Sequence, residues 1–145
     1  MAFKVVIFSD ANKIFGMYRA VVAWSDLADS SFLLTIQNTD IEIVISEFVL
    51  LELEIICKRN WISWNETFLQ RFFECTQFTI FSSKKHNTMY ESYVQDIGDA
   101  QILQDAVDSW SIFLLTGNMK DFHIKKIYDM FGILVINDLH QAIVA

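Results

Sequence analysis

Hydrophobic residues along the chain form two kinds of pattern: short continuous runs, and longer stretches in which they recur every three or four residues. The continuous runs are rich in β-branched residues, which is typical of buried strands. They lie at residues 3–8, 41–45, 78–81, 133–136 and just before Thr116. The helical spacing covers residues 14–28, 46–59, 61–75, 99–110 and 123–131, while residues 30–37 fit either a helix or a strand. This alternation predicts an α/β fold with three layers, α/β/α, around a mostly parallel sheet of four to five strands.

The expected helix at 99–110 is amphipathic. At 100° per residue it has an apolar face and a polar face, and the apolar face should pack on the sheet. The apolar face carries Ile102, Leu103, Ala106, Val107 and Trp110. The polar face carries Gln101, Gln104, Asp105 and Asp108. Two helix ends are also signalled: Ser46 as an N-cap and Gly132 as a C-cap.

The length of 145 residues suits one domain that spans residues 1–145. No apolar run approaches the roughly 18 residues that a membrane span needs. The run at residues 5–8 is too short for the core of a signal peptide, so a cytoplasmic location without membrane contact is expected. Cys57 and Cys75 show neither metal-binding nor redox spacing, and no disulfide is expected.

Composition adds two expectations about partners. Hydrophobic residues make up 53% of the chain and charged residues only 20%, which favours an apolar interface with a partner. The net charge of −7 disfavours a protein that coats nucleic acid. It does not exclude a nuclease, because metal-dependent nucleases gather carboxylates and the bound metals restore the local potential.

Three acidic side chains lie at positions where a charged carboxylate is unfavourable unless it has a partner. Asp10 directly follows the first expected strand. Glu52 falls inside the apolar arc of the helix at 46–59, so either a metal or basic group partners it or its carboxylate reaches solvent along the helix edge. Asp99 falls on the apolar side of its helix, as an N-cap or as a metal ligand at the end of a cleft.

Two further polar residues follow the strand that ends before Thr116. They are Asn118 and Asp121, and Asp121 either reaches the same site or caps a helix that begins at Phe122. In a parallel sheet, residues that follow strands or begin helices lie toward one edge, so Asp10, Glu52 and Asp99 can share a site with this pair. Oxygen ligands without cysteine or paired histidine suit Mg²⁺ or Mn²⁺.

Four segments together resemble the PIN domain, as found in ribonucleases of the VapC type from toxin–antitoxin pairs and in their PilT-N-terminus-like relatives. They are Asp10-Ala11-Asn12 after a strand and the segments 45–53 (ISEFVLLEL), 99–106 (DAQILQDA) and 114–122 (LLTGNMKDF). Each motif alone is weak, and their order and the intervening strands make the set more specific. Residues 60–95 carry no motif of the family.

The resemblance implies roles for individual residues. Asp10, Glu52 and Asp99 would be the acidic metal ligands, with Asn12 and Thr116 supporting them from behind. Many family members have Asp where this chain has Asn118, within T-G-D or T-R-D, and others carry T-x-N-x-x-D-F as here. The amide removes one negative charge and weakens the expected hold on a second metal. Asp121 would compensate, directly or through water, if its loop points inward.

The leading functional hypothesis is a Mg²⁺- or Mn²⁺-dependent endoribonuclease, the toxin of a toxin–antitoxin pair, with RNA as substrate, an antitoxin as partner and a homodimer as assembly. Asp10 and Asp99 would hold metal, Glu52 would complete the ligand set or orient water, and Asn118 would position water or phosphate. Candidate contacts to the RNA backbone, each also explicable as an ordinary surface charge, are Arg59, Arg71, Lys84, Lys85, His86, Lys120, Lys125 and Lys126.

Two rival hypotheses remain. One is a PIN-like interaction module with weak or no catalysis, whose apolar surface binds a protein partner. The other is a phosphoryl-transfer enzyme of a different kind. It is disfavoured because no Walker loop is present and Ser9-Asp10-Ala11-Asn12 lacks the second Asp of a D-x-D motif of the haloacid-dehalogenase type.

Overall fold

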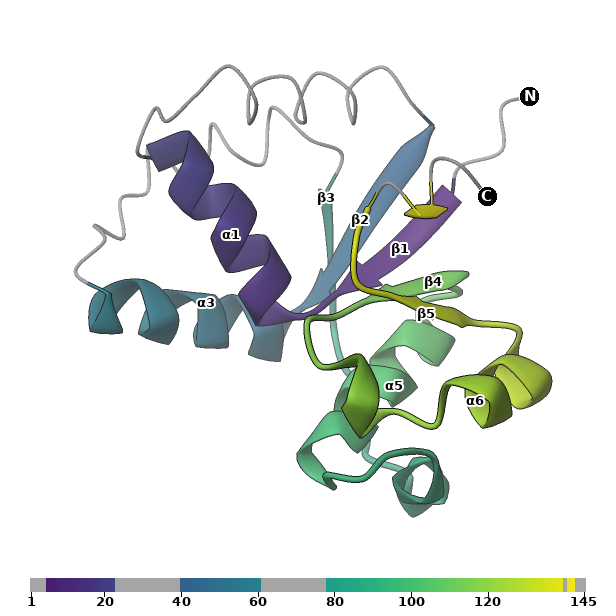
Figure 1. Ribbon diagram of the computed structural model, residues 1–145. Coiled ribbons are helices and arrows are strands. Elements are labelled where there is room, and N and C mark those ends of the chain that lie inside the picture. Colours follow the sequence, from purple (N-terminus) through teal and green to yellow (C-terminus); the bar gives the residue numbers. More distant parts are fainter. Residues whose placement is uncertain (1–4, 23–39, 61–77, 140, 143–145) are drawn as a thin grey trace.

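A computed structural model describes residues 5–22, 40–60, 78–139 and 141–142 of the chain (Figure 1). The expected elements at residues 30–37 and 61–75 lie outside the described residues, as do Arg71, Cys75 and the end of the expected helix at 14–28. A helical turn does follow Asp138, where the Gln141 amide nitrogen donates to the Asp138 carbonyl (3.0 Å). The sequence also predicts a terminal helix that begins at Asp138, and residues 140 and 143–145 of this segment lie outside the described residues.

The centre of the molecule is a parallel sheet, which confirms the predicted α/β fold. Its strands are β1 (Val5–Ser9), β2 (Ile41–Ser46), β3 (Phe78–Phe81), β4 (Phe113–Leu115) and β5 (Leu134–Ile136). They lie in the order β3-β2-β1-β4-β5, and every neighbouring pair is parallel. The buried runs Ile7–Phe8 and Ile43–Ile45 explain why the central strands read as continuous apolar segments, since helices cover them on both faces.

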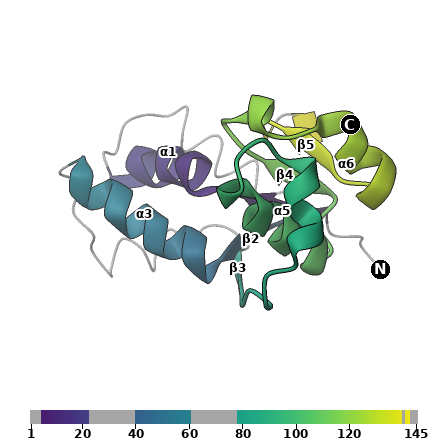
Figure 2. The same ribbon diagram turned by 90° about the horizontal axis from the view of Figure 1, so that it is seen from below.

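Helices lie on both faces of the sheet, as predicted (Figures 1 and 2). Helices α1 (Ala11–Val22) and α3 (Glu47–Arg59) contact each other on one side. Helices α5 (Gly98–Asp108) and α6 (Ile124–Phe131) lie on the other side, where α5 contacts β1 and β4 and α6 contacts β5. Two short 3₁₀ helices, η1 (Thr88–Tyr93) and η2 (Met119–Asp121), accompany them.

The strand order places a topological switch between β1 and β4. From β1 the chain first builds β2 and β3 on one side, and it then crosses to build β4 and β5 on the other. Open α/β sheets form a crevice at the carboxyl ends of the strands where this reversal occurs. Asp10 follows β1 and Thr116 follows β4, so both residues stand at this crevice.

Both predicted helix ends are confirmed. The Ser46 hydroxyl accepts a hydrogen bond from the Val49 amide nitrogen (3.1 Å), which is the N-cap arrangement at the start of α3. Gly132 ends α6 with φ at 71°, a left-handed conformation that favours glycine because residues with a side chain are strained at positive φ.

The predicted faces of α5 are correct at its centre and wrong at two places. Leu103 and Ala106 are fully buried, as expected. Trp110, which the pattern places on the buried face, is 87% exposed. The helix ends at Asp108, and Trp110 has φ at 61°, so its side chain leaves the line of the apolar face.

The supposed polar face of α5 is also buried at Gln104 and Asp105, because residues 83–87 pack over it. Asn87 donates its amide hydrogen to Gln104 Oε1 (2.8 Å), and Gln104 Nε2 donates to the Lys85 carbonyl (2.8 Å). Asp105 accepts from the Ser83 hydroxyl (2.8 Å). Burial raises the pKa of Asp105, while the hydrogen bonds that it accepts act in the opposite direction.

Two other features complete the fold. Phe131 of α6 packs against Tyr90 and Tyr93 of η1, with ring centroids 5.5 and 5.0 Å apart. Cys57 is a buried free thiol in the core. In the part of the chain that the structure describes, no helix is long and apolar enough to cross a membrane.

Candidate active site

Asp10 is the most constrained of the predicted site residues. It stands between the end of β1 and the start of α1, and only 6% of it is exposed. Its Oδ1 accepts a hydrogen bond from the Lys13 amide nitrogen (3.0 Å), and its Oδ2 accepts from the Thr116 hydroxyl (2.6 Å). Asp10 therefore caps α1, and each of its carboxylate oxygens keeps lone-pair capacity for a further partner.

Thr116 connects the two strands of the switch point. Its hydroxyl donates to Asp10 and accepts from the Asn118 amide nitrogen (3.1 Å), while the side chain itself is buried. The structure thus brings the Thr116 hydroxyl into direct contact with the Asp10 carboxylate. Asn118 is exposed and lies directly before η2, two residues after Thr116.

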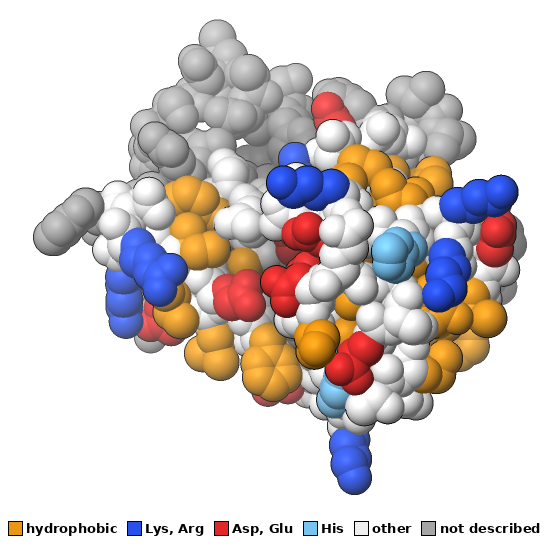
Figure 3. All heavy atoms as spheres, turned by 60° about the horizontal axis from the view of Figure 1, so that its bottom comes forward, with side chains coloured by type: hydrophobic (Ala, Val, Ile, Leu, Met, Phe, Trp, Pro, Cys, Tyr) orange, Lys and Arg blue, Asp and Glu red, His pale blue; other side chains and the backbone are white. Residues whose placement is uncertain are grey.

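Asp99 is the electrostatic centre of the site. Its partial burial raises the pKa of Asp99 to about 6, and repulsion from Asp121, Asp96, Asp10 and Glu52 adds to that shift. Three of these four neighbours are residues that the sequence pattern singled out. Figure 3 shows acidic side chains gathered near the middle of one face of the molecule, beside hydrophobic ones.

Glu52 stands on α3 at the edge of this group. It is exposed, yet partial desolvation and the charge of Asp10 raise its pKa. Its side chain lines a hollow together with Asn12 and Arg59. The sequence left open whether Glu52 has a metal or basic partner or reaches solvent along the helix edge. In the structure its carboxylate reaches solvent, and it still interacts with the other acids.

The capping alternatives for Asp99 and Asp121 are wrong. Helix α5 begins at Gly98, its N-cap residue Ile97 makes no side-chain cap bond, and Asp99 lies inside the first turn. The capping carboxylate is Asp96, whose Oδ1 accepts from the Gly98 amide nitrogen (3.0 Å). Helix α6 begins at Ile124, beyond the reach of the expected cap, and Asp121 belongs to η2 instead.

Two residues near the site were not singled out from the sequence. Asp96 both caps α5 and adds negative charge beside Asp99. Lys13 lies in the first turn of α1, and its Cε is 3.9 Å from the position that a Cβ at Gly117 would take. The sequence could have indicated Lys13, because it follows Asp10 by three residues and this spacing places the two residues together at the start of α1.

The donor chemistry of these residues suits a hard divalent cation. All the candidate ligands are oxygen atoms. Burial, and to a smaller extent repulsion between the acids, raises the pKa values of Asp99 and Glu52, and a cation would offset both effects. Among the described residues, however, no three Asp, Glu, His or Cys side chains stand together at the spacing of a ligand set. The carboxylates would therefore have to move closer together to hold a metal, and the exposed Glu52 has the most room to do so.

The partial burial of Asp99, together with the repulsion around it, predicts a gain in stability when its charge is removed. Because the folded-state pKa lies above the unfolded value of 3.8, the folded chain loses stability as the pH rises from about 4 to about 6. Asp99→Asn should therefore stabilise the metal-free protein above pH 6, on the order of 1 kcal/mol after allowance for solvent screening. Urea denaturation at pH 4.5, 6 and 7.5 in the presence of EDTA measures this difference.

The expected difference between parent and variant grows with pH up to neutrality and is then constant. Asp40→Asn is the matched control, because Asp40 is exposed just before β2, at the opposite end of the strands from the site. Equal unfolding midpoints for the parent and Asp99→Asn at pH 7.5 would show that Asp99 carries no such repulsion.

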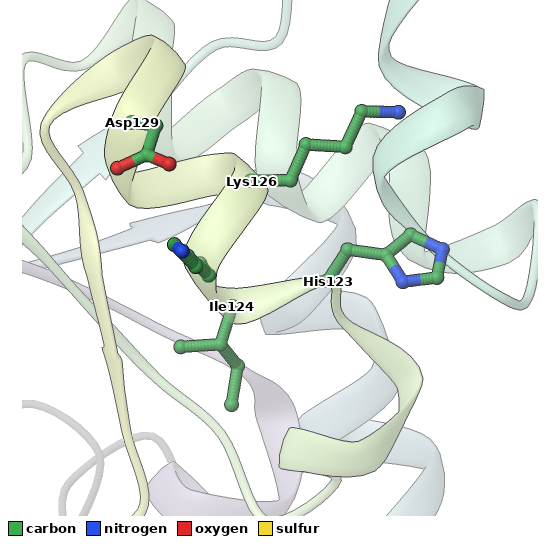
Figure 4. Close-up of a pocket in the computed structure, with 5 residues that line it drawn as sticks. His123, Ile124, Lys126 and Asp129 are labelled. Atoms are coloured by element: carbon green, nitrogen blue, oxygen red, sulfur yellow. The ribbon is translucent and has the colours of Figure 1, made fainter.

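A larger hollow lies away from the carboxylates. It measures about 550 Å³ at the start of α6, where His123, Ile124, Lys126 and Asp129 surround it (Figure 4). Lys126 is already engaged, with its Nζ 3.2 Å from the Ser92 carbonyl oxygen and 4.7 Å from the centre of the Tyr93 ring. The candidate chemistry therefore lies at the switch point and not in this broader depression.

Comparisons with known proteins bear on the fold. No protein-family profile and no curated protein sequence matches the chain. Among solved structures, the chain is similar to one in the crystal structure of VapBC2 from Rickettsia felis bound to a DNA fragment from their promoter, with a TM-score of 0.52 and 18% sequence identity. The match covers 90% of this chain and 97% of the other. The protein therefore shares its parallel α/β fold with a component of that VapBC2 assembly.

Proposed function

We propose that this protein is a Mg²⁺- or Mn²⁺-dependent endoribonuclease of the PIN type that acts as the toxin of a toxin–antitoxin pair. One observation carries the proposal. Asp10, Glu52, Asp99 and Asp121 come from four separate segments, and all of them interact electrostatically around Asp99 at the switch point of the sheet. Mutual repulsion of this kind destabilises a fold, so an acidic cluster at a cleft is a candidate functional site.

The roles of the residues follow from their surroundings. Asp10 and Asp99 would hold metal, and Thr116 would fix the orientation of the Asp10 carboxylate through its 2.6 Å hydrogen bond. Glu52 would complete the ligands or orient water, Asp121 would add a carboxylate from the opposite wall, and Asn118 would position water or phosphate. A bound divalent cation supplies the activation of water and the neutralisation of phosphate charge. Asn12, beside Glu52 in the same hollow, would support that side chain.

The partner part of the proposal is supported by the comparison and by the surface of α3. The similar structure is an assembly of VapBC2 with DNA. Helix α3 leaves Leu51 and Ile55 exposed at 56% and 48%, one turn apart on the same face. An antitoxin segment is the proposed occupant of this strip. The homodimer expected from the apolar composition stays a prediction.

A second candidate function is a PIN-like module that binds its partner without cleaving RNA. It is favoured by the absence, within the described residues, of three acids at ligand spacing and by the amide at Asn118. Both candidates use the same fold and the same partner surface. They differ in whether the acidic group binds a metal.

Calorimetric titration with Mn²⁺ separates the two candidates. The nuclease proposal expects saturable binding below millimolar metal, together with Mn²⁺-dependent cleavage of single-stranded RNA. Affinity should increase from pH 5 to pH 7, because Asp99 must lose its proton before it can hold the cation. Asp99→Asn should weaken binding, and Asp40→Asn should bind as the parent does.

An absence of binding at millimolar Mn²⁺ would contradict the nuclease proposal and favour the inert module. Binding that does not depend on Asp99 would show that the metal site lies elsewhere.

A further inference from the structure

A second hollow of about 290 Å³ opens directly beside the acidic group, between the first turns of α3 and α5. Its volume lies at the lower end of small-ligand sites, which span about 300–1,000 Å³, so it suits one planar ring system. Glu52 lines this hollow and also interacts with Asp10 and Asp99. A group bound here would therefore lie next to the candidate active site.

One wall of the hollow is apolar and includes an aromatic ring. Phe48 is 56% exposed, although it lies in the first turn of α3, whose other face is well packed. Ile102 contributes a partly buried side chain from α5. An exposed aromatic ring at the rim of a hollow offers a face for a flat heterocycle. Stacking of a nucleic-acid base on such a ring contributes about 1–3 kcal/mol.

The other wall is polar and rigid. Asp105 is 1% exposed and is held by the Ser83 hydroxyl (2.8 Å) and by Gln101 Nε2 (2.9 Å). Gln101 is in turn held by His86, whose Nδ1 lies 3.1 Å from Gln101 Oε1. These cross-connections fix the polar wall before any ligand arrives, which lowers the cost of binding.

The charge of the hollow indicates which part of an RNA strand would enter it. Glu52 and Asp105 make it acidic, so it repels phosphate and accepts a neutral base. Carboxylates accept hydrogen bonds from exocyclic amino groups, as Asp and Glu do from cytosine N4. Adenine, cytosine and guanine carry such groups, whereas uracil presents carbonyl oxygens.

We propose that this hollow binds one unpaired, amino-bearing base of an RNA strand whose backbone crosses the neighbouring acidic group, and that Phe48 is the residue on which the base stacks. The inference rests on the proposed ribonuclease function, because that function supplies the RNA. It goes beyond that function by assigning base preference to a hollow that shares only Glu52 with the proposed metal-binding carboxylates.

The test measures stacking without cleavage. A single-stranded RNA with one 2-aminopurine is titrated with protein in EDTA, and the fluorescence of the 2-aminopurine is expected to fall as the base stacks. Phe48→Ala should weaken this binding by about tenfold, in line with the loss of one stacked base. Phe48→Tyr should restore it, because it keeps an aromatic face.

Tyr128→Ala is the matched control. Tyr128 is an aromatic residue on α6 with almost the same exposed fraction as Phe48, 55% against 56%, and it does not line the hollow. A second measurement compares cleavage of RNAs that place A, C, G or U at one position in a constant sequence. Phe48→Ala should raise KM for the preferred base more than it changes kcat.

The outcomes separate this inference from the function on which it rests. Binding that depends on Phe48, together with an absence of metal-dependent cleavage, supports the base site and overturns the nuclease. Metal-dependent cleavage with equal binding by the parent, Phe48→Ala and Tyr128→Ala supports the nuclease and overturns the base site. An absence of quenching at protein concentrations that bind the RNA also overturns the base site. The base site is likewise overturned if Phe48→Ala loses binding to a protein partner and keeps its binding to RNA.

Discussion

Asp10→Asn is expected to lower Mn²⁺-dependent RNA cleavage on the order of 10²–10³-fold, the loss typical when one preorganised electrostatic group is removed. The substitution keeps the size of the side chain and an oxygen that can accept from Lys13 or Thr116. It removes the charge that a divalent cation would bind. The fold should therefore survive, and circular dichroism with thermal unfolding verifies that it does.

Initial rates on a fluorescently labelled single-stranded RNA measure the loss. Asp40→Asn is again the control. It removes one exposed negative charge just before β2, at the end of the strands opposite to the site. Asp99→Asn should share the loss of activity while it gains stability in EDTA. Cleavage by Asp10→Asn at the rate of Asp40→Asn would show that Asp10 is not part of the reaction.

Leu103→Ala is expected to lower the free energy of unfolding by about 2–5 kcal/mol, the range found for deletion of a fully buried leucine. Leu103 lies on α5, which packs against β1 and β4, and its side chain has no exposed surface. Urea denaturation in EDTA at pH 7.5 measures the change. A two-state transition with an unchanged slope is required for the comparison.

Trp110→Ala is the informative control for this variant. The periodic pattern places both residues on one apolar face, yet Trp110 is 87% exposed. Its replacement should change stability by less than about 0.5 kcal/mol, as for surface residues in general. A loss at Trp110 comparable to that at Leu103 would mean that α5 continues beyond Asp108 and buries this ring.

The pattern of hydrophobic residues predicted the fold because these residues recur wherever a strand or one face of a helix is buried. The runs that became the central strands β1 and β2 are continuous because helices cover both faces of the sheet there, and the cap chemistry of Ser46 and Gly132 marked helix ends correctly. The edge strand β3 is only partly buried, with Ile80 48% exposed. The segment that covers Gln104 and Asp105 has no such signal. Its contacts are hydrogen bonds to particular backbone atoms, which leave no hydrophobic period in the sequence.

The candidate site was partly predictable for the same kind of reason. Asp10, Glu52 and Asp99 were identified because each is an acid at an apolar position, and the structure brings them within electrostatic reach of one another. The capping role of Asp96 depends on where α5 starts, a boundary that periodicity fixes poorly. The base-sized hollow depends on how two helix ends meet, and no single segment encodes it.

The hydrogen bond between Thr116 and Asp10 has a consequence for the newly made protein. The two residues are 106 positions apart, and β4, the neighbour of β1 on that side, is also made late in the sequence. A chain still attached to the ribosome with only its first hundred residues exposed has neither the strand nor the hydroxyl that positions Asp10. Under the proposed function, the nuclease site is therefore not assembled before Thr116 has left the ribosome.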